Sequence, residues 1–315
     1  MISILCPCRD EEAALPLFFE RVVAVMEKIG EPFEIVCVDD GSTDETLSVL
    51  KARAAEDLRV RAVELSRNFG KEAALTAALD HSRGDAVVPI DADLQDPPEL
   101  IPLMVEKWRE GWDVVLARRA DRSSDGWLKR TTARAFYRVH NEISSPRIPE
   151  DVGDFRLMDR RVVDALGSLR ETRRFMKGLF AWAGFRACEV EYVRPPRAAG
   201  ATKFSGWRLW KLAVEGITSF SVAPLTVWSY VGGTTALGAF LYGLWIFVRT
   251  LIFGIDLPGY ASQICLILLF GGLQLLGIGI LGEYLGRTYM ESKRRPIYIV
   301  RAVFGGKEGV PHDAP

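Results

Sequence analysis

Pro89-Ile90-Asp91-Ala92-Asp93-Leu94-Gln95-Asp96-Pro97-Pro98 is the stretch around which this chain is organised. The apolar, β-branched run Ala86–Val88 before it predicts a buried strand that runs out into acidic residues. Three carboxylates this close repel one another unless a cation lies between them, and oxygen ligands suit Mg²⁺ or Mn²⁺. A solvated turn with an Asp that caps the next helix explains the same residues. The stretch alone leaves both interpretations open.

Strand and helix patterns alternate through the first part of the chain. Apolar strands are expected at Ile2–Cys6, Phe33–Val38, Val60–Leu65, Ala86–Ile90 and Asp113–Leu116. Helical patterns lie between them, beginning at Asp10, Thr43, Lys71 and Glu99. This alternation predicts an α/β fold with a mostly parallel sheet and right-handed crossovers.

Polar clusters follow four successive strands of this predicted sheet. They are Pro7–Glu11, Asp39–Ser42, Ser66–Lys71 and Asp91–Asp96. Because ligands bind beyond the carboxyl ends of parallel strands, the clusters predict a single site at one rim of the sheet. Strand-to-helix turns are commonly polar, but that does not explain the excess of paired acids.

No glycine-rich phosphate loop accompanies these strands. Gly70-Lys71 lacks the flanking residues of a P-loop, and no G-x-G-x-x-G follows the first strand. A nucleotide here would need a metal and basic side chains to neutralise its diphosphate. Arg pairs with phosphate through two hydrogen bonds, although a basic run is often only a solvated helix face. The candidates after the fifth strand are Arg118, Arg119, Arg122, Lys129, Arg130 and Arg134.

Charge and cysteine usage limit the class of protein. The formal net charge is -1, so bulk attraction to nucleic acid is not expected. The five Cys residues have no metal-site spacing, which predicts free thiols in a reducing, cytosolic compartment.

Two long uncharged segments, 222–248 and 257–282, each exceed the roughly 20 residues that a bilayer-spanning helix needs. The short connection between them makes a hairpin. Lys and Arg gather on its outer flanks, against Arg249 in the connection. The positive-inside rule therefore places the N-terminal domain and the C-terminus in the cytosol, on the inner face of the cytoplasmic membrane.

The hairpin gives a four-part organisation. Residues 1–203 form the cytosolic domain, 204–220 an interfacial amphipathic helix rich in Trp and Phe, and 221–286 the two spans. Residues 287–315 form a cytosolic tail. Its strand-like segment Pro296–Phe304 could pair with another subunit.

Five motifs, in this order, resemble family 2 glycosyltransferases, above all the polyprenyl-phosphate glycosyltransferases of the dolichol-phosphate mannose synthase and bactoprenol glucosyltransferase type. They are Cys6–Glu12, Val38–Asp44, Arg67–Lys71, Asp91–Glu99 and Gly153–Leu157. The resemblance covers about residues 2–300 and includes the hairpin. It implies a GT-A fold, a Rossmann-like, mostly parallel α/β sheet, with a nucleotide-sugar donor.

The resemblance also implies roles for particular residues. The nucleotide sugar would contact Pro7, Arg9, Glu11, Asp39, Asp40, Ser42, Lys71, Asp91, Ala92 and Asp93. The metal, Mg²⁺ or Mn²⁺, would be held by Asp91, Asp93 and Gln95, while Asp96 is expected to cap the next helix. The acceptor phosphate would meet Arg118, Arg130, Arg156, Arg197, Lys203 and Ser205. Catalysis would rest on Asp154, Asp93 and Arg118, with Asp154 at the family's position for a base.

The implied reaction transfers a hexose, with inversion, from a nucleotide sugar such as UDP-glucose to polyprenyl phosphate, here undecaprenyl phosphate. The product would serve cell-envelope glycan modification, such as that of lipopolysaccharide. A homotetramer in the membrane and a flippase partner are further expectations from the family. A phosphate monoester has a second pKa of ~6 and is mostly dianionic at neutral pH, so it leaves a base little to remove. Asp154 is therefore expected mainly to orient Arg156 or the acceptor, or to stabilise developing positive charge.

Other functions remain open from the sequence. The donor could be UDP-N-acetylglucosamine or GDP-mannose, and the acceptor another lipid such as a diacylglycerol. A processive polysaccharide synthase is disfavoured because no Gln-x-x-Arg-Trp motif is present. A non-catalytic membrane scaffold that binds sugar nucleotides is the alternative from another class.

Overall fold

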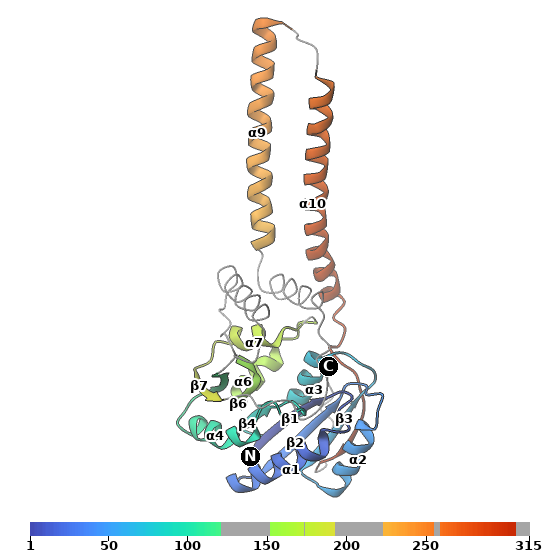
Figure 1. Cartoon of the computed structure of the whole chain (residues 1–315), viewed down its shortest axis with the longest axis vertical. Coiled ribbons are helices and arrows are strands. Elements are labelled where there is room, and N and C mark those ends of the chain that lie inside the picture. Colours follow the sequence, from blue (N-terminus) through green and yellow to red (C-terminus); the bar gives the residue numbers. More distant parts are fainter. Residues whose placement is uncertain (121–151, 173, 193–222, 255–258, 307–315) are drawn as a thin grey trace. The chain divides into compact units, whose positions relative to one another are not determined.

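A computed structural model describes residues 1–120, 152–172, 174–192, 223–254 and 259–306 (Figure 1). The described residues fall into two units, one within Met1–Ala213 and Arg295–Pro315 and the other within Val214–Arg294. The predicted interfacial helix at 204–220 lies outside the described residues.

The first unit is built on one eight-stranded sheet with the strand order β7-β5-β6-β4-β1-β2-β3-β8. β1 pairs in parallel with β2 and β4, β2 with β3, and β5 with β7, whereas β6 and β8 run antiparallel to their neighbours. The predicted mostly parallel α/β fold is confirmed. The strands are β1 (Ile2–Cys8), β2 (Phe33–Asp39), β3 (Val60–Leu65), β4 (Ala86–Pro89), β5 (Val114–Arg119), β6 (Val152–Asp159), β7 (Ala187–Tyr192) and β8 (Val300–Gly305).

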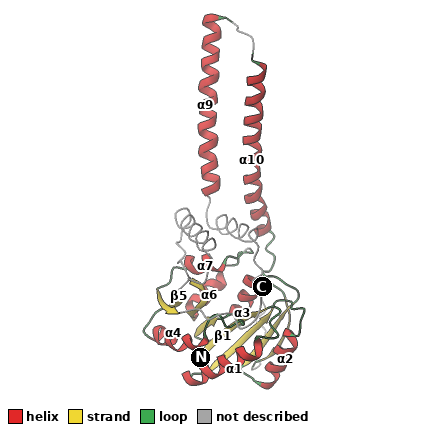
Figure 2. Cartoon of the chain, in the orientation of Figure 1, coloured by secondary structure: helices red, strands yellow, loops and turns green. Residues whose placement is uncertain are grey.

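Helices cover both faces of the sheet (Figure 2). Helices α1, α2 and α4 form one group of neighbours, and α3 contacts β1, β2 and α6. Because both faces are covered, β2 and β3 are buried along their whole length, which explains why apolar residues occupy both faces of these strands. The helices are α1 (Leu15–Ile29), α2 (Thr46–Glu56), α3 (Lys71–Asp80), the 3₁₀ helix η1 (Pro98–Leu100), α4 (Ile101–Arg109), α6 (Arg160–Ser168) and α7 (Met176–Trp182).

Two elements differ from the sequence-based expectation. The first helix begins at Leu15 and not at Asp10, because residues 10–12 are held by the loop that follows β2. The tail strand is present, and β8 pairs with β3 of its own chain. Its side chains also contact β3 and α2: Arg301 Nη1 lies 3.2 Å from Glu64 Oε1, and the ammonium of Lys51 lies 4.4 Å from the Phe304 ring centroid.

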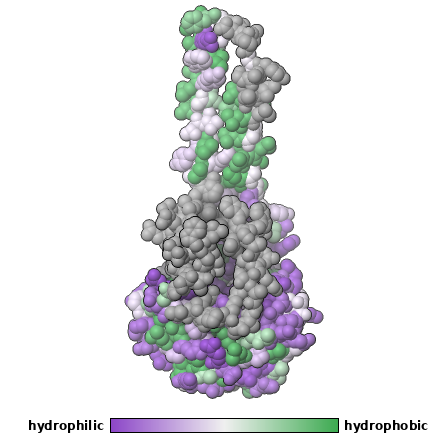
Figure 3. Space-filling view, in the orientation of Figure 1, coloured by the Kyte–Doolittle hydropathy of each residue, from purple (hydrophilic) through white to green (hydrophobic). Residues whose placement is uncertain are grey.

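The second unit consists of α9 (Ala223–Phe253) and α10 (Tyr260–Ser292). Segments Leu225–Phe253 and Leu269–Ser292 are long and apolar enough to cross a membrane, and their side chains are almost entirely exposed (Figure 3). The predicted pair of apolar helices is therefore confirmed. Trp228 packs on Gly277: a Cβ added to that glycine would lie 2.1 Å from Trp228 Nε1.

Candidate active site

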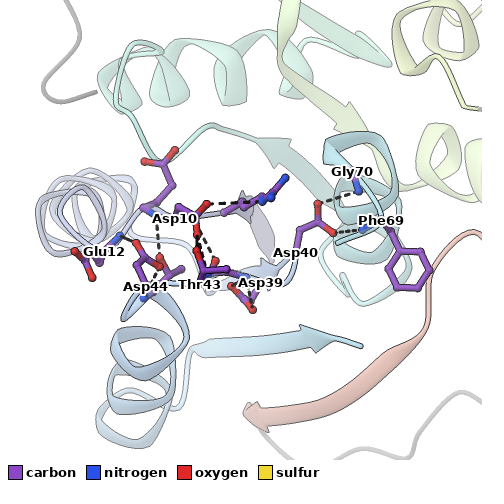
Figure 4. A network of polar contacts seen from close by, with 12 residues as sticks. Asp10, Glu12, Asp39, Asp40, Thr43, Asp44, Phe69 and Gly70 are labelled. Atoms are coloured by element: carbon purple, nitrogen blue, oxygen red, sulfur yellow. Dashed lines mark hydrogen bonds and ion pairs between the residues drawn. The ribbon is translucent and has the colours of Figure 1, made fainter. Parts of the chain in front are cut away.

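The loops after β1 and β2 are bound to each other by side chain–backbone hydrogen bonds (Figure 4). Asp10 Oδ1 accepts a hydrogen bond from Thr43 N at 2.8 Å, and Glu12 Oε2 accepts one from Glu45 N at 2.9 Å. In the other direction, Asp44 Oδ2 accepts a hydrogen bond from Glu12 N at 3.3 Å. Several acids of this rim thus serve the backbone, which ties two successive strand ends into one rigid wall.

Asp40 connects this wall to the loop that precedes α3. Its two carboxylate oxygens accept hydrogen bonds from Phe69 N at 2.7 Å and from Gly70 N at 2.9 Å (Figure 4). Burial raises the pKa of Asp40, although these two hydrogen bonds oppose the rise. Gly41 between the loops has φ +66°, and a Cβ there would lie 2.7 Å from Asn68 N, so only glycine fits. Asp40 therefore orients the segment that leads to Lys71.

Lys71 lies at the centre of the candidate site. Its Nζ is 2.7 Å from Asp91 Oδ1 and 3.1 Å from Asp154 Oδ2. The three residues come from the start of α3, the loop that follows β4 and the strand β6. A small pocket opens here, lined by Pro7, Lys71, Leu75, Pro89, Ile90, Asp91, Asp96, Asp154 and Phe155. The antiparallel insertion of β6 beside β4 brings Asp154 next to the acidic stretch that follows β4.

Lys71 and Asp154 are ionised at neutral pH. Desolvation works against the charge of Lys71, but Asp91 and Asp154 outweigh it and raise the pKa of the lysine. Desolvation also works against the charge of Asp154, yet Lys71, Lys177 and Arg156 together hold the pKa of Asp154 below its ordinary value. A carboxylate with a lowered pKa is a weak proton acceptor. The arrangement suits Asp154 to orientation and charge stabilisation.

Arg156 supports the backbone on which Asp154 lies. It is 5% exposed, its Nη2 donates a hydrogen bond to Gly153 O at 2.7 Å, and its guanidinium lies 3.9 Å from the centroid of the Phe180 ring. Burial lowers the pKa of Arg156 to about 10, and its buried Nε has no hydrogen-bond partner among the described residues. The structure thus buries Arg156 against the backbone next to Asp154, whereas the resemblance assigned Arg156 to the acceptor phosphate.

Glu72 and Lys177 are residues of this site that the sequence analysis missed. Glu72 Oε2 accepts a hydrogen bond from Met176 N at 3.3 Å. Desolvation, and then the charge of Asp154, raise the pKa of Glu72 to about 7. Lys177 acts electrostatically on both carboxyl groups. The one signal for Glu72 was its position directly after Lys71, and nothing in the sequence indicated that α7 would lie there.

The residues expected to hold a divalent ion were tested against the geometry after β4. Asp93 Oδ1 accepts a hydrogen bond from Gln95 N at 3.1 Å, and Leu94 between them has φ 55°. Gln95 Oε1 is buried and has no hydrogen-bond partner in the part of the chain that the structure describes. Carboxylate and amide oxygens are the donors that Mg²⁺ and Mn²⁺ prefer, so this donor set fits such an ion. Across the described ranges, however, no three His, Cys, Asp or Glu side chains gather as a metal site.

Asp96 was expected to cap the following helix, and this expectation is wrong. The 3₁₀ helix η1 begins at Pro98, and its N-cap residue Pro97 makes no side-chain cap. Asp96 Oδ1 instead accepts a hydrogen bond from Tyr192 Oη of β7 at 2.6 Å. The proline pair fixes the helix start without a carboxylate.

The remaining predicted site residues either lie elsewhere along the rim of the sheet or fall outside the described residues. Arg118, on β5, lies opposite Val152 of β6 and donates a hydrogen bond to Glu189 Oε2 at 2.9 Å. Arg9 is half exposed, with its Nε 3.8 Å from Asp10 Oδ2. Ser42 Oγ accepts a hydrogen bond from Asp10 N at 3.1 Å. Glu11 N donates to Thr46 Oγ1, Ser42 N lies 3.4 Å from the Asp39 carboxylate, and Ala92 is buried. Arg130, Arg197, Lys203 and Ser205 fall outside the described residues.

Comparison with known proteins gives this geometry a family. The profile described as Glycosyl transferase family 2 matches residues 3–167. The chain is 53% identical over 302 residues to the prophage bactoprenol glucosyl transferase homolog of Escherichia coli K12, covering 96% of this chain and 99% of that protein.

Two further relatives extend the match. The bactoprenol glucosyl transferase of Shigella phage SfV is 54% identical over 300 residues, covering 95% of this chain and 98% of that protein. An uncharacterized glycosyltransferase of Synechocystis is 48% identical over 304 residues, covering 96% of both chains. The chain therefore belongs to glycosyl transferase family 2.

Proposed function

We propose that this glycosyltransferase transfers glucose from UDP-glucose to the phosphate of a polyprenyl phosphate, undecaprenyl phosphate, with inversion at the anomeric carbon. One observation carries the chemistry: the acidic stretch after β4 and the strand β6 meet at Lys71 Nζ, within 3.1 Å of both Asp91 and Asp154. The names of the relatives, which specify bactoprenol and glucose, support the choice of acceptor and sugar.

Asp154 orients the acceptor and stabilises positive charge at the anomeric carbon. The acceptor phosphate is mostly dianionic at neutral pH because its second pKa is ~6. It therefore attacks without first losing a proton. Asp154 is itself ionised and paired with Lys71, and its negative charge would stabilise an oxocarbenium-like transition state beside it.

Asp91, Asp93 and Gln95 would hold a divalent ion, Mg²⁺ or Mn²⁺. Such an ion, when bound, supplies positive charge for the leaving nucleoside diphosphate. Gln95 Oε1 is buried without a hydrogen-bond partner among the described residues, and this supports the assignment. Asp91 is paired with Lys71, so the side chain of Lys71 keeps a positive charge beside the same diphosphate.

The two apolar helices would cross the cytoplasmic membrane as a hairpin, with the sheet-containing unit in the cytosol. The polyprenyl phosphate is then available at the membrane surface, and a flippase would be needed to carry the product to the other leaflet. A homotetramer remains the expected assembly.

The experiment is product analysis with purified protein, undecaprenyl phosphate and labelled UDP-glucose, UDP-N-acetylglucosamine and GDP-mannose, with and without chelator. The proposal predicts an acid-labile, lipid-linked sugar from UDP-glucose, and loss of the product in the chelator. If the protein transfers sugar faster from another donor, the sugar of that donor would replace glucose in the proposal. A glycosylated diacylglycerol, whose sugar linkage is not acid-labile, would show that the acceptor is diacylglycerol and not polyprenyl phosphate. Binding of the nucleotide sugar without any transfer would favour the scaffold alternative.

A further inference from the structure

We propose that Glu72 is a positioning residue that holds α7 against β6 and thereby fixes Asp154 for transfer. The inference rests on the proposed function. It concerns a residue that takes no direct part in the reaction described above. Glu72 follows Lys71 on α3, so one turn of one helix carries both the central cation and this carboxylate. Its hydrogen bond to Met176 N, the first residue of α7, spans from that helix to α7.

Helix α7 in turn reaches the strand that carries Asp154 by two routes. Phe180 lies against the guanidinium of Arg156, which donates to Gly153 O next to Asp154. Lys177 acts electrostatically on Asp154 itself. Since α7 is only seven residues long, it contributes little stability of its own, and its position depends on contacts such as that of Glu72.

The charges around Glu72 come from three elements. Lys71 lies on its own helix, Asp154 on β6 and Lys177 on α7, and Arg174 lies just before α7. The pKa of Glu72 is raised to about 7, so its hydrogen bond to Met176 N becomes charge-assisted as the pH rises through neutrality. Ionised Glu72 accepts this hydrogen bond more strongly than the protonated form does, although burial and Asp154 oppose its ionisation, and activity should rise across the same range.

The test compares the full-length protein with Glu72→Ala, Glu72→Gln and the control Glu34→Gln. Glu34 is a buried carboxyl that also accepts a backbone hydrogen bond, from Arg83 N at 2.6 Å, but it lies at the amino end of β2. We expect kcat of Glu72→Ala to fall by about tenfold to a hundredfold, with KM for the donor unchanged, because small misplacements at a reacting group are costly. Hydrogen exchange at the first amides of α7 should become faster, and Glu34→Gln should retain the kcat of the wild type.

Glu72→Gln decides the matter if Glu72→Ala does not fold. It keeps an acceptor oxygen for Met176 N, so a smaller loss is expected, together with loss of the rise in activity near pH 7. The titration of the acceptor phosphate near pH ~6 remains in this variant. Wild-type kcat and a wild-type pH profile in Glu72→Gln would overturn the inference, as would unchanged kcat or unchanged α7 exchange in Glu72→Ala. An inactive wild type would instead overturn the proposed function, and the inference with it.

Discussion

Lys71 Nζ lies 3.1 Å from Asp154 Oδ2, although the two residues are 83 positions apart and belong to α3 and β6. The same ammonium group binds Asp91, so one positive charge is shared by the carboxylates of two separate motifs. This contact defines the electrostatics of the site.

Replacing Lys71 with Met should lower kcat/KM by about a hundredfold, since the variant loses the charge that holds both carboxylates. The pH dependence should change as well. Lys71 helps to keep the pKa of Asp154 low, so its removal raises that pKa, and Asp154 becomes protonated at a higher pH than in the wild type.

The measurement is kcat/KM against pH for the wild type, Lys71→Met and Lys107→Met. Lys107 is an exposed lysine paired with Glu110 on α4 and serves as the control. The acid limb of Lys71→Met should move to higher pH, and that of Lys107→Met should not. Coincident acid limbs in all three proteins would contradict this role of Lys71.

Asp154→Asn separates a base from an orienting group. If Asp154 removed a proton from the acceptor, the variant would recover activity as the acceptor ionises above its second pKa of ~6. If Asp154 orients the acceptor and stabilises charge, its loss should reduce kcat by the same factor at about pH 5 and at about pH 8, on both sides of that pKa. We expect the constant factor. Recovery to wild-type kcat at the alkaline end would restore the base role.

Glu72→Gln should change how stability depends on pH. The folded-state pKa of Glu72, about 7, is raised above its ordinary value of 4.5. Folding therefore favours the neutral carboxyl. Its contribution to the free energy of unfolding is fully present below about pH 4.5 and is lost as the pH rises through about 7. At most about 3 kcal/mol is involved. The free energy of unfolding of Glu72→Gln minus that of the wild type should therefore be larger at about pH 8 than at about pH 5. Denaturant titration in detergent measures this difference. An equal difference at both pH values would contradict the raised pKa.

Gly277→Val tests the packing of the two apolar helices. A Cβ at Gly277 would meet the indole of Trp228, whereas nothing lies within 4 Å of a Cβ at Gly279. Gly277→Val should therefore destabilise the protein by about 1–3 kcal/mol, and Gly279→Val should not. Thermal unfolding in detergent measures both, and Trp228→Ala should relieve the effect of Gly277→Val. Equal losses in the two glycine variants would contradict the observed packing.

Much of the fold was predictable because burial on both faces leaves a local signal. The parallel strands β2 and β3 are mostly apolar on both faces, and their lengths and order along the chain follow from that pattern. The rim was predictable for the same reason, since the polar residues begin where each apolar run ends. The two apolar helices follow from their length and composition.

The interior of the site was less predictable because its contacts are made between distant segments. Sequence periodicity does not report which strands are neighbours, so it gave no indication that β6 inserts antiparallel beside β4 or that β8 pairs with β3. It also cannot tell an acid that binds a ligand from one that accepts backbone hydrogen bonds, as Asp40 does. Glu72 was missed because its partner, Met176, is 104 residues away.

The most direct measurement is the transfer of labelled glucose from UDP-glucose to undecaprenyl phosphate by the purified wild type, with Lys71→Met and Asp154→Asn beside it. The account predicts an acid-labile, lipid-linked product from the wild type and a strongly reduced rate in both variants, with the fold retained. No labelled lipid from the wild type with any nucleotide sugar, or wild-type rates in both variants, would contradict it.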